Sequence, residues 1–66
     1  MKLFIKMKGR EMYLASSEEW SETPAQARDF QRFTLALDHV QKRKLENVEA
    51  LYWFENEPRF NFVLGF

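Results

Sequence analysis

The residue types that most often do chemistry in proteins are scarce in this chain, and none has a suitable neighbour in the sequence. His39 is the only histidine, and a histidine acting as a general base needs an orienting acid and a nucleophile within hydrogen-bond reach. Asp38 precedes it directly, and adjacent residues on a helix point about a third of a turn apart. There is no cysteine, so no thiolate can serve as a nucleophile or metal ligand. We predict no catalytic residue and no enzyme, and we interpret His39 as an exposed helix residue.

The sequence gives equally little support for a cofactor or a metal site. The only glycines are Gly9 and Gly65, which rules out a glycine-rich phosphate-binding loop. A metal site at His39 would have to be completed by carboxylates alone. The acidic segment 18–22 lacks the regular ligand spacing and the glycine of a calcium loop. We therefore predict no cofactor and no metal, and we interpret the acidic segment as a solvated loop.

Positive charge is grouped at two places, which makes nucleic-acid binding an alternative to consider. A basic face on the first predicted strand, with one phenylalanine among its lysines, could follow a phosphate backbone and stack a base. The end of the predicted helix is also basic. The candidate contact residues are Lys2, Phe4, Lys6, Lys8, Lys42, Arg43 and Lys44. Lysines on an edge strand also deter aggregation, and ten basic residues are balanced by ten acidic ones, whereas nucleic-acid binders are usually basic.

The C-terminal part of the chain carries the strongest signal, because six of the last fifteen residues are aromatic. They fall on two strand-like runs, 48–54 and 60–66, joined by a short polar turn. Side chains on a strand alternate between faces, and neither face of this predicted hairpin is polar. One face holds Leu51, Trp53 and Val63, an apolar patch of the kind that monomers seldom expose. We predict a protein interface at these three residues, most simply that of a homodimer.

Two N-terminal strands are predicted to precede a helix. Residues 2–8 alternate apolar and mostly basic side chains, which is typical of a half-buried strand. A turn at Gly9-Arg10 leads to a second strand over residues 11–15. The polar segment 16–22 is predicted to be a loop, in which Trp20 folds back as a lid on the core.

The segment Thr23-Pro24-Ala25-Gln26 predicts the start of a helical segment. Threonine suits the N-cap position, proline suits the first helical position, and Gln26 could complete a capping box. An apolar stripe recurs at three- and four-residue steps through Phe30, Phe33, Ala36, Leu37 and Val40. Three cations at 42–44 suit the end of the helix. Periodicity allows either one helix over 24–44 or a short turn followed by a main helix from about Arg32, and we favour the break.

These elements predict one small α+β domain over residues 1–66, with the order β-β-α-β-β. We expect a mostly antiparallel sheet of up to four strands, with one main helix packed on one face. Without disulfides the stability must come from the core, in which aromatic residues bury large areas. Phe30, Leu37 and Phe62 are predicted to be core residues.

The first forty residues also carry a pattern that resembles a known group of proteins. The spacing of Tyr13-Leu14, Trp20, Thr23, Ala27, Phe30 and Ala36 is similar to that of short bacterial and phage-associated α+β proteins of uncharacterised function. The matching positions are core and capping positions. The resemblance implies a small domain in a prokaryotic or phage setting, and it implies no activity.

Two hypotheses follow for the function. The first is a non-enzymatic protein-interaction module, for which a phage-type inhibitor of a host protein is one possible form. The second is a small nucleic-acid-binding domain. No apolar run reaches the ~20 residues that span a bilayer, and residues 1–10 are too rich in charge for a signal peptide. We therefore expect an intracellular, cytoplasmic protein with no membrane contact.

Overall fold

The computed structural model describes residues 1–15 and 18–66; Ser16 and Ser17, which the sequence places in the loop before Trp20, lie outside the described residues. The elements are β1 (Lys2–Met7), β2 (Tyr13–Leu14), β3 (Trp20–Ser21), η1 (Pro24–Gln26), α1 (Phe33–Arg43), β4 (Val48–Trp53), η2 (Pro58–Phe60) and β5 (Phe62–Gly65). The two η elements are single 3₁₀ turns.

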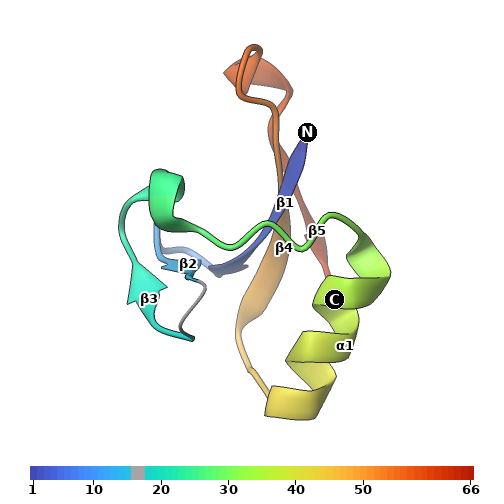
Figure 1. The fold of residues 1–66 in the computed structure, drawn as a ribbon. Helices are drawn as coiled ribbons and strands as arrows, with labels where there is room; N and C mark the ends of the chain where they lie inside the picture. Colours follow the sequence, from blue (N-terminus) through green and yellow to red (C-terminus); the bar gives the residue numbers. More distant parts are fainter. Residues whose placement is uncertain (16–17) are drawn as a thin grey trace.

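The described strands form one antiparallel sheet in the order β3-β2-β1-β4-β5, and α1 lies against one of its faces (Figure 1). The α+β class and the single helix on an antiparallel sheet confirm the prediction. The sheet has five strands and not four, because part of the predicted loop is a strand: Trp20 pairs with Leu14, and Ser21 pairs with Tyr13. From β3, Trp20 packs against the main core cluster, which is the packing expected of the lid.

The helix begins and ends close to its predicted limits, and the favoured break before it is confirmed. Helix α1 starts at Phe33, and a separate 3₁₀ turn occupies Pro24–Gln26. The chain leaves α1 at Lys44, whose φ of 53° is left-handed. The predicted capping role of the Thr23 side chain is wrong, because this side chain makes no cap hydrogen bond.

Ser21 stabilises the 3₁₀ turn in place of a capping box. Its Oγ accepts a hydrogen bond from the N–H of Thr23 and donates one to Oε1 of Gln26, both at 3.0 Å. The carbonyl of Thr23 accepts from the N–H of Gln26 at 3.0 Å. The turn is therefore closed by its own backbone and by a side chain of β3.

Strand β1 is the centre of the fold, because apolar side chains pack on both of its faces. The main cluster lies on the α1 side and contains Leu3, Ile5, Leu14, Phe30, Ala36, Val40, Val48 and Ala50. A smaller cluster on the other face contains Phe4, Tyr13 and Leu51, with Ala27 and Trp53 against it. Apolar side chains therefore cover both faces of the sheet at β1, its central strand.

The irregular segment 27–30 closes the side of β1 that the short strand β2 leaves open. The N–H of Phe30 donates to the carbonyl of Leu3 at 2.8 Å, and Oδ1 of Asp29 accepts from the N–H of Leu3 at 3.1 Å. The segment crosses from the β2–β3 side to the start of α1 (Figure 1). It therefore completes the hydrogen bonding of the central strand and delivers Phe30 to the core, where this ring is 5% exposed.

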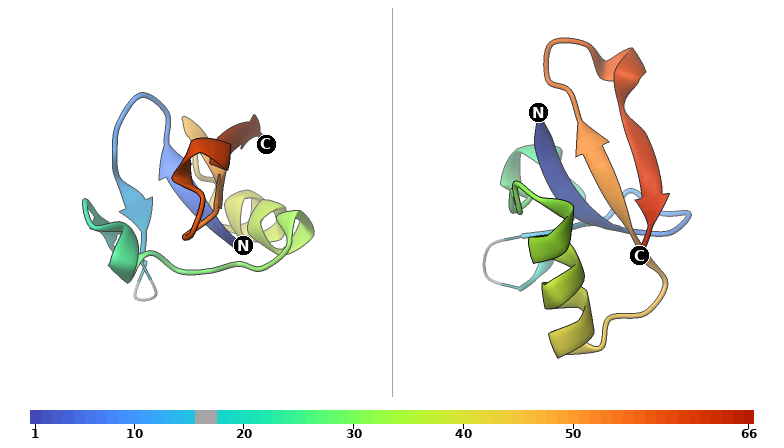
Figure 2. Two further views of the ribbon diagram at one scale, coloured as in Figure 1. Left: turned by 90° about the horizontal axis from the view of Figure 1, so that it is seen from above. Right: turned by 90° about the vertical axis from the view of Figure 1, so that its right-hand side faces the viewer.

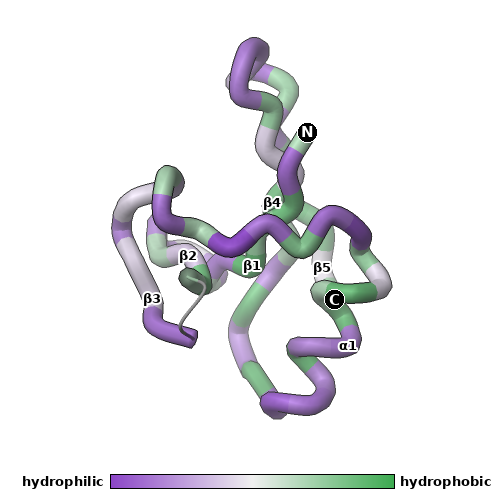
Figure 3. The backbone as a smooth tube through the Cα atoms, in the orientation of Figure 1, coloured by the Kyte–Doolittle hydropathy of each residue, from purple (hydrophilic) through white to green (hydrophobic). Residues whose placement is uncertain are grey.

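Of the three predicted core residues, Phe30 is confirmed, Leu37 is half-buried, and the prediction for Phe62 is wrong. Phe62 is 49% exposed, because β5 is an outer strand of the sheet whereas α1 packs on the side chains of β1 and β4. The tip of the β4–β5 hairpin projects beyond the rest of the sheet (Figure 2), and this tip is hydrophilic (Figure 3). In the described part of the chain, no helix has the length and apolar character needed to cross a membrane.

Candidate functional site

Strand β5 is a hydrophobic strand that the fold leaves at the surface. All four of its residues are exposed, with Phe62, Val63 and Leu64 at 49%, 48% and 48%. Phe60 before the strand is 54% exposed, and Phe66 after it is 36% exposed. A contiguous group of exposed apolar side chains of this kind usually marks a contact with another molecule.

The position of β5 in the sheet explains this exposure. It pairs with β4 on one side, and no strand among residues 1–15 and 18–66 pairs with its other side. The aromatic rings on this strand and directly after it pack against nearby rings. Phe62 stacks on Tyr52 with ring centroids 4.6 Å apart, and Phe66 stacks on Phe33 of α1 at 5.3 Å.

The three predicted interface residues occupy different environments. Leu51 is 7% exposed and lies within the smaller cluster. Trp53 is half-buried, because its ring packs at 5.8 Å from Phe4. Val63 lies on the free strand. The exposed apolar residues therefore lie further out on the hairpin than predicted, and of the three predicted residues only Val63 is among them.

Sequence reasoning missed Phe60, Phe62, Leu64 and Phe66 as surface residues, because strand parity gives the face of a residue but not the position of its strand in the sheet. One signal was available. Residues 60–66 contain no charged side chain, whereas the chain as a whole is 30% charged. Lysine, proline and inward-pointing charges are the usual protection of an edge strand, and this strand has none of them.

The predicted basic face of β1 is largely occupied by contacts within the protein. Phe4 is 2% exposed, so it offers no ring to a base. Lys6 forms an ion pair with Glu49 at 3.2 Å, and these side chains are only 15% and 17% exposed. Lys2 pairs with Glu55 at 2.5 Å, and this pairing raises the pKa of Lys2. The edge-protection interpretation of these lysines is wrong, because β1 is the central strand.

The second basic group is separated from Lys2 and Lys6 by the sheet. Register places Lys2 beside Trp53 and Lys6 beside Glu49, on the face opposite α1. At the end of α1, Lys42 pairs with Asp38 at 3.1 Å, and Arg43 pairs with Glu18 at 2.5 Å. Lys8 and Lys44 are exposed. The sheet therefore separates Lys2 and Lys6 from the helix-end cations, whereas the N–H of Lys8 donates to the carbonyl of Asn47, in the loop after α1, at 2.9 Å.

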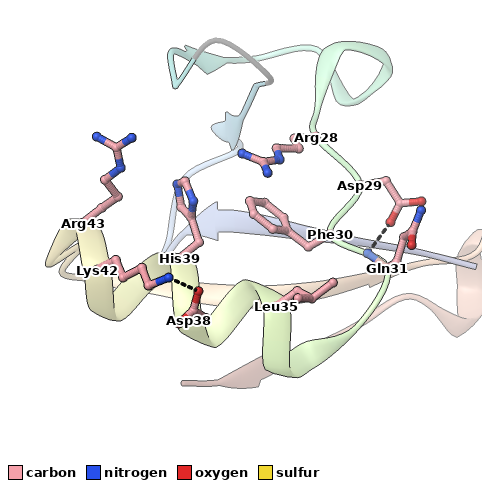
Figure 4. A pocket seen from close by; sticks show the side chains of 9 residues that line it. All are labelled: Arg28, Asp29, Phe30, Gln31, Leu35, Asp38, His39, Lys42 and Arg43. Carbon is pink, nitrogen blue, oxygen red and sulfur yellow. Dashed lines mark hydrogen bonds and ion pairs between the residues drawn. The ribbon is translucent and has the colours of Figure 1, made fainter.

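A polar hollow of about 400 Å³ lies between α1 and residues 28–31, and it contains the only histidine (Figure 4). His39 is half-buried and not exposed as predicted, since its ring packs against Phe30 at 5.2 Å. Burial is the main cause that lowers the pKa of His39, and the nearby Arg28 lowers it further. The guanidinium of Arg28 lies over Phe30, 4.6 Å from the ring centre.

The described residues around this hollow do not form a catalytic or metal-binding group. None of the described residues that line it has a hydroxyl or thiol side chain that His39 could activate, and two of its cations, Lys42 and Arg43, are already paired with carboxylates. Within the described residues, no three side chains of histidine, aspartate or glutamate come together as metal ligands. The hollow is therefore a weaker candidate than the exposed strand.

Comparison with known proteins adds no relative that could direct the choice. No protein-family model, no curated protein and no solved structure matches the chain. The function must therefore be inferred from the geometry of β5 and its surroundings.

Proposed function

We propose that this protein is a non-enzymatic interaction module that binds another protein, most simply a second copy of itself, through its C-terminal hairpin. The observation that carries this proposal is the exposure of three consecutive apolar residues, at 48–49% each, on an outer strand that pairs with β4 along one edge only among the described residues. Leaving them in water forgoes about 25 cal/mol for each Å² of apolar area that a partner could cover.

The composition of the hairpin also supports a protein partner. The exposed side chains are aromatic and aliphatic, as in the cores of protein interfaces. Charged residues lie around them at the hairpin tip, where Glu57 and Arg59 are exposed and form an ion pair at 3.3 Å. An apolar centre with a charged rim is the usual anatomy of a protein contact surface.

Sedimentation equilibrium over a range of protein concentrations tests the homodimer directly. We expect the average mass to rise from one chain toward two, and Leu64→Glu to keep the mass at one chain while the far-ultraviolet circular dichroism stays native. Leu35→Glu is the matched control, because Leu35 on α1 is 47% exposed, nearly the same as Leu64. A wild-type protein that remains one chain at millimolar concentration would contradict the homodimer.

The nucleic-acid alternative receives less support from this geometry, because Phe4 is buried and Lys2 and Lys6 already have carboxylate partners. It stays a prediction that a salt-dependent gel shift with mixed DNA and RNA would test. The prokaryotic or phage setting also belongs to the proposal. In its inhibitor form, the same hairpin would bind the surface of a host protein.

A further inference from the structure

The direction of the backbone groups of β4 follows from hydrogen bonds on the far side of β1. Leu3 donates its N–H to Asp29 Oδ1 at 3.1 Å and accepts at its carbonyl from the N–H of Phe30 at 2.8 Å. Both backbone groups of Leu3 therefore point away from β4. Leu3 pairs with Tyr52, and the residues of an antiparallel pair exchange either both hydrogen bonds or neither. The backbone groups of Tyr52 therefore point toward β5.

The same alternation decides which groups of β5 face outward. Tyr52 pairs with Phe62, so this pair exchanges hydrogen bonds. Residues two apart on a strand point the same way, so Phe62 and Leu64 direct their backbone groups to β4. Val63 and Gly65 then direct their N–H and C=O groups to the free edge. This edge has two residues ready to pair, and no charged side chain lies among them.

We propose that this edge pairs with β5 of a second copy, antiparallel, about a two-fold axis that passes between the two Leu64 residues. This pairing rests on the proposed function above and specifies how the two copies meet. Val63 of each copy exchanges backbone hydrogen bonds with Gly65 of the other, and Phe62 lies opposite Phe66. The two sheets become one continuous sheet, and both α1 helices lie on the same face of it.

This register pairs more of the outward backbone groups of β5 than the two adjacent registers do. Centring the axis on Val63 would require Asn61 to pair with Gly65, but the N–H of Asn61 already donates to the carbonyl of Pro58 at 3.0 Å. Among the described residues, centring it on Gly65 would pair only one of the two outward residues, Gly65, with a residue of the other copy. With the axis at Leu64, both outward residues are paired, and the exposed rings on the helix face meet in cross-strand aromatic pairs.

A second copy pairs with this edge because two β5 strands in antiparallel order match each other's outward backbone groups. The two-fold axis makes the contact the same for both copies, so the pair is closed. On the face opposite α1, each Val63 side chain lies beside Gly65 of the other copy. The space there is open, since a Cβ added to Gly65 would meet no atom within 4 Å beyond its own chain neighbours. The other outer strand of the sheet, β3, is only two residues long. It is too short to continue the pairing, so a two-fold dimer ends the assembly and no fibre grows from it.

Cysteine cross-linking tests the register of the β5–β5 pairing, since the native chain has no cysteine that could interfere. Leu64→Cys places the two new side chains directly opposite in a non-hydrogen-bonded pair, where Cα atoms lie ~4.5 Å apart, within disulfide range. Phe62→Cys is the matched control, because Phe62 has the same exposure but lies opposite Phe66. Under copper-catalysed air oxidation we expect Leu64→Cys to become a covalent dimer and Phe62→Cys to stay largely monomeric on a non-reducing gel.

Two further measurements test the backbone pairing itself. The N–H of Val63 points outward, so Val63→Pro removes no internal strand bond and should give a folded monomer. In the wild-type protein, the amides of Val63 and Gly65 should exchange with deuterium slowly when dimeric and quickly when dilute, while those of Phe62 and Leu64 stay protected. The exchange measurement holds even where the proline variant fails to fold.

The results separate this inference from the proposed function. A wild-type dimer with rapidly exchanging Val63 and Gly65 amides, or with equally rapid cross-linking at Phe62 and Leu64, would overturn the edge pairing and leave the interaction module standing. A wild-type protein that is monomeric at every concentration would overturn the edge pairing together with the homodimer form of the proposed function.

Discussion

The central strand β1 and the outer strand β5 each contain three consecutive apolar residues, yet their environments are opposite. Leu3, Phe4 and Ile5 are 0%, 2% and 0% exposed, whereas the three apolar residues of β5 are 48–49% exposed. The difference comes from the elements that surround each strand. Strand β1 is paired on one side by β4 and on the other by β2 and the segment 27–30, and clusters cover both its faces. The composition of a strand therefore does not say whether it forms core or contact surface; its place in the sheet does.

The largest expected effect is the loss of a ring from β1. Phe4→Ala should lower the free energy of unfolding by about 3–5 kcal/mol, because it removes a fully buried side chain and leaves a cavity. Phe62→Ala should change the stability of the dilute monomer much less, since half of that side chain is in water. Urea titration of both variants at low concentration measures the contrast. Equal losses would mean that β5 is as well covered as β1.

The second test concerns the irregular segment that covers β1. Asp29 Oδ1 accepts from the N–H groups of Leu3 and Gln31 at 3.1 Å and 2.9 Å. Asp29→Ala should lower the stability by about 1.5–3 kcal/mol, the range for hydrogen bonds to a charged group. Asp38→Ala is the control, because this exposed carboxylate makes a helix-surface pair with Lys42 worth about 0.5 kcal/mol or less. Similar losses for both aspartates would argue against the closing role of segment 27–30.

A third test uses pH at the ring that packs on Phe30. The pKa of His39 lies below its ordinary value of 6.5 because of burial first and the charge of Arg28 second, partly opposed by Glu18. The unfolded chain therefore binds a proton more readily than the folded one. The contribution of the neutral His39 ring to the stability of the folded state is fully present above pH 6.5 and is lost as the pH falls through its lowered pKa.

The matched variant is His39→Gln, which has no titrating ring. Thermal unfolding at pH 7.5 and at pH 5.5 should show a loss of stability at the lower pH for the wild type and a smaller loss for the variant. The same loss in both proteins would assign the pH dependence to other titrating groups.

The sequence predicted the parts of this fold that depend on local pattern. The alternation of Leu3 and Ile5 with lysines marked β1, and the apolar spacing and basic end marked α1. Strand β3 was missed because its two residues lie in a polar stretch, where alternation is too short to detect. The exposure of Phe62 was missed for a different reason. Parity correctly placed it on the face of Tyr52, but only long-range pairing decides that α1 lies over β1 and leaves β5 uncovered.

The smallest expected effect tests which side chain, that of Thr23 or that of Ser21, supports the 3₁₀ turn. Sequence spacing assigned a capping role to Thr23, whereas the structure gives the side-chain hydrogen bonds of that turn to Ser21. Thr23→Ala should therefore leave the denaturation midpoint nearly unchanged. Ser21→Ala should lower the stability by about 0.5–1.5 kcal/mol, the usual net value of such hydrogen bonds. These bonds are exposed, so the low end of that range is expected, and the loss should stay below that of Asp29→Ala. The reverse order, with Thr23→Ala the more damaging of the two, would restore the capping box and shift the support of the turn from β3 to its own first residue.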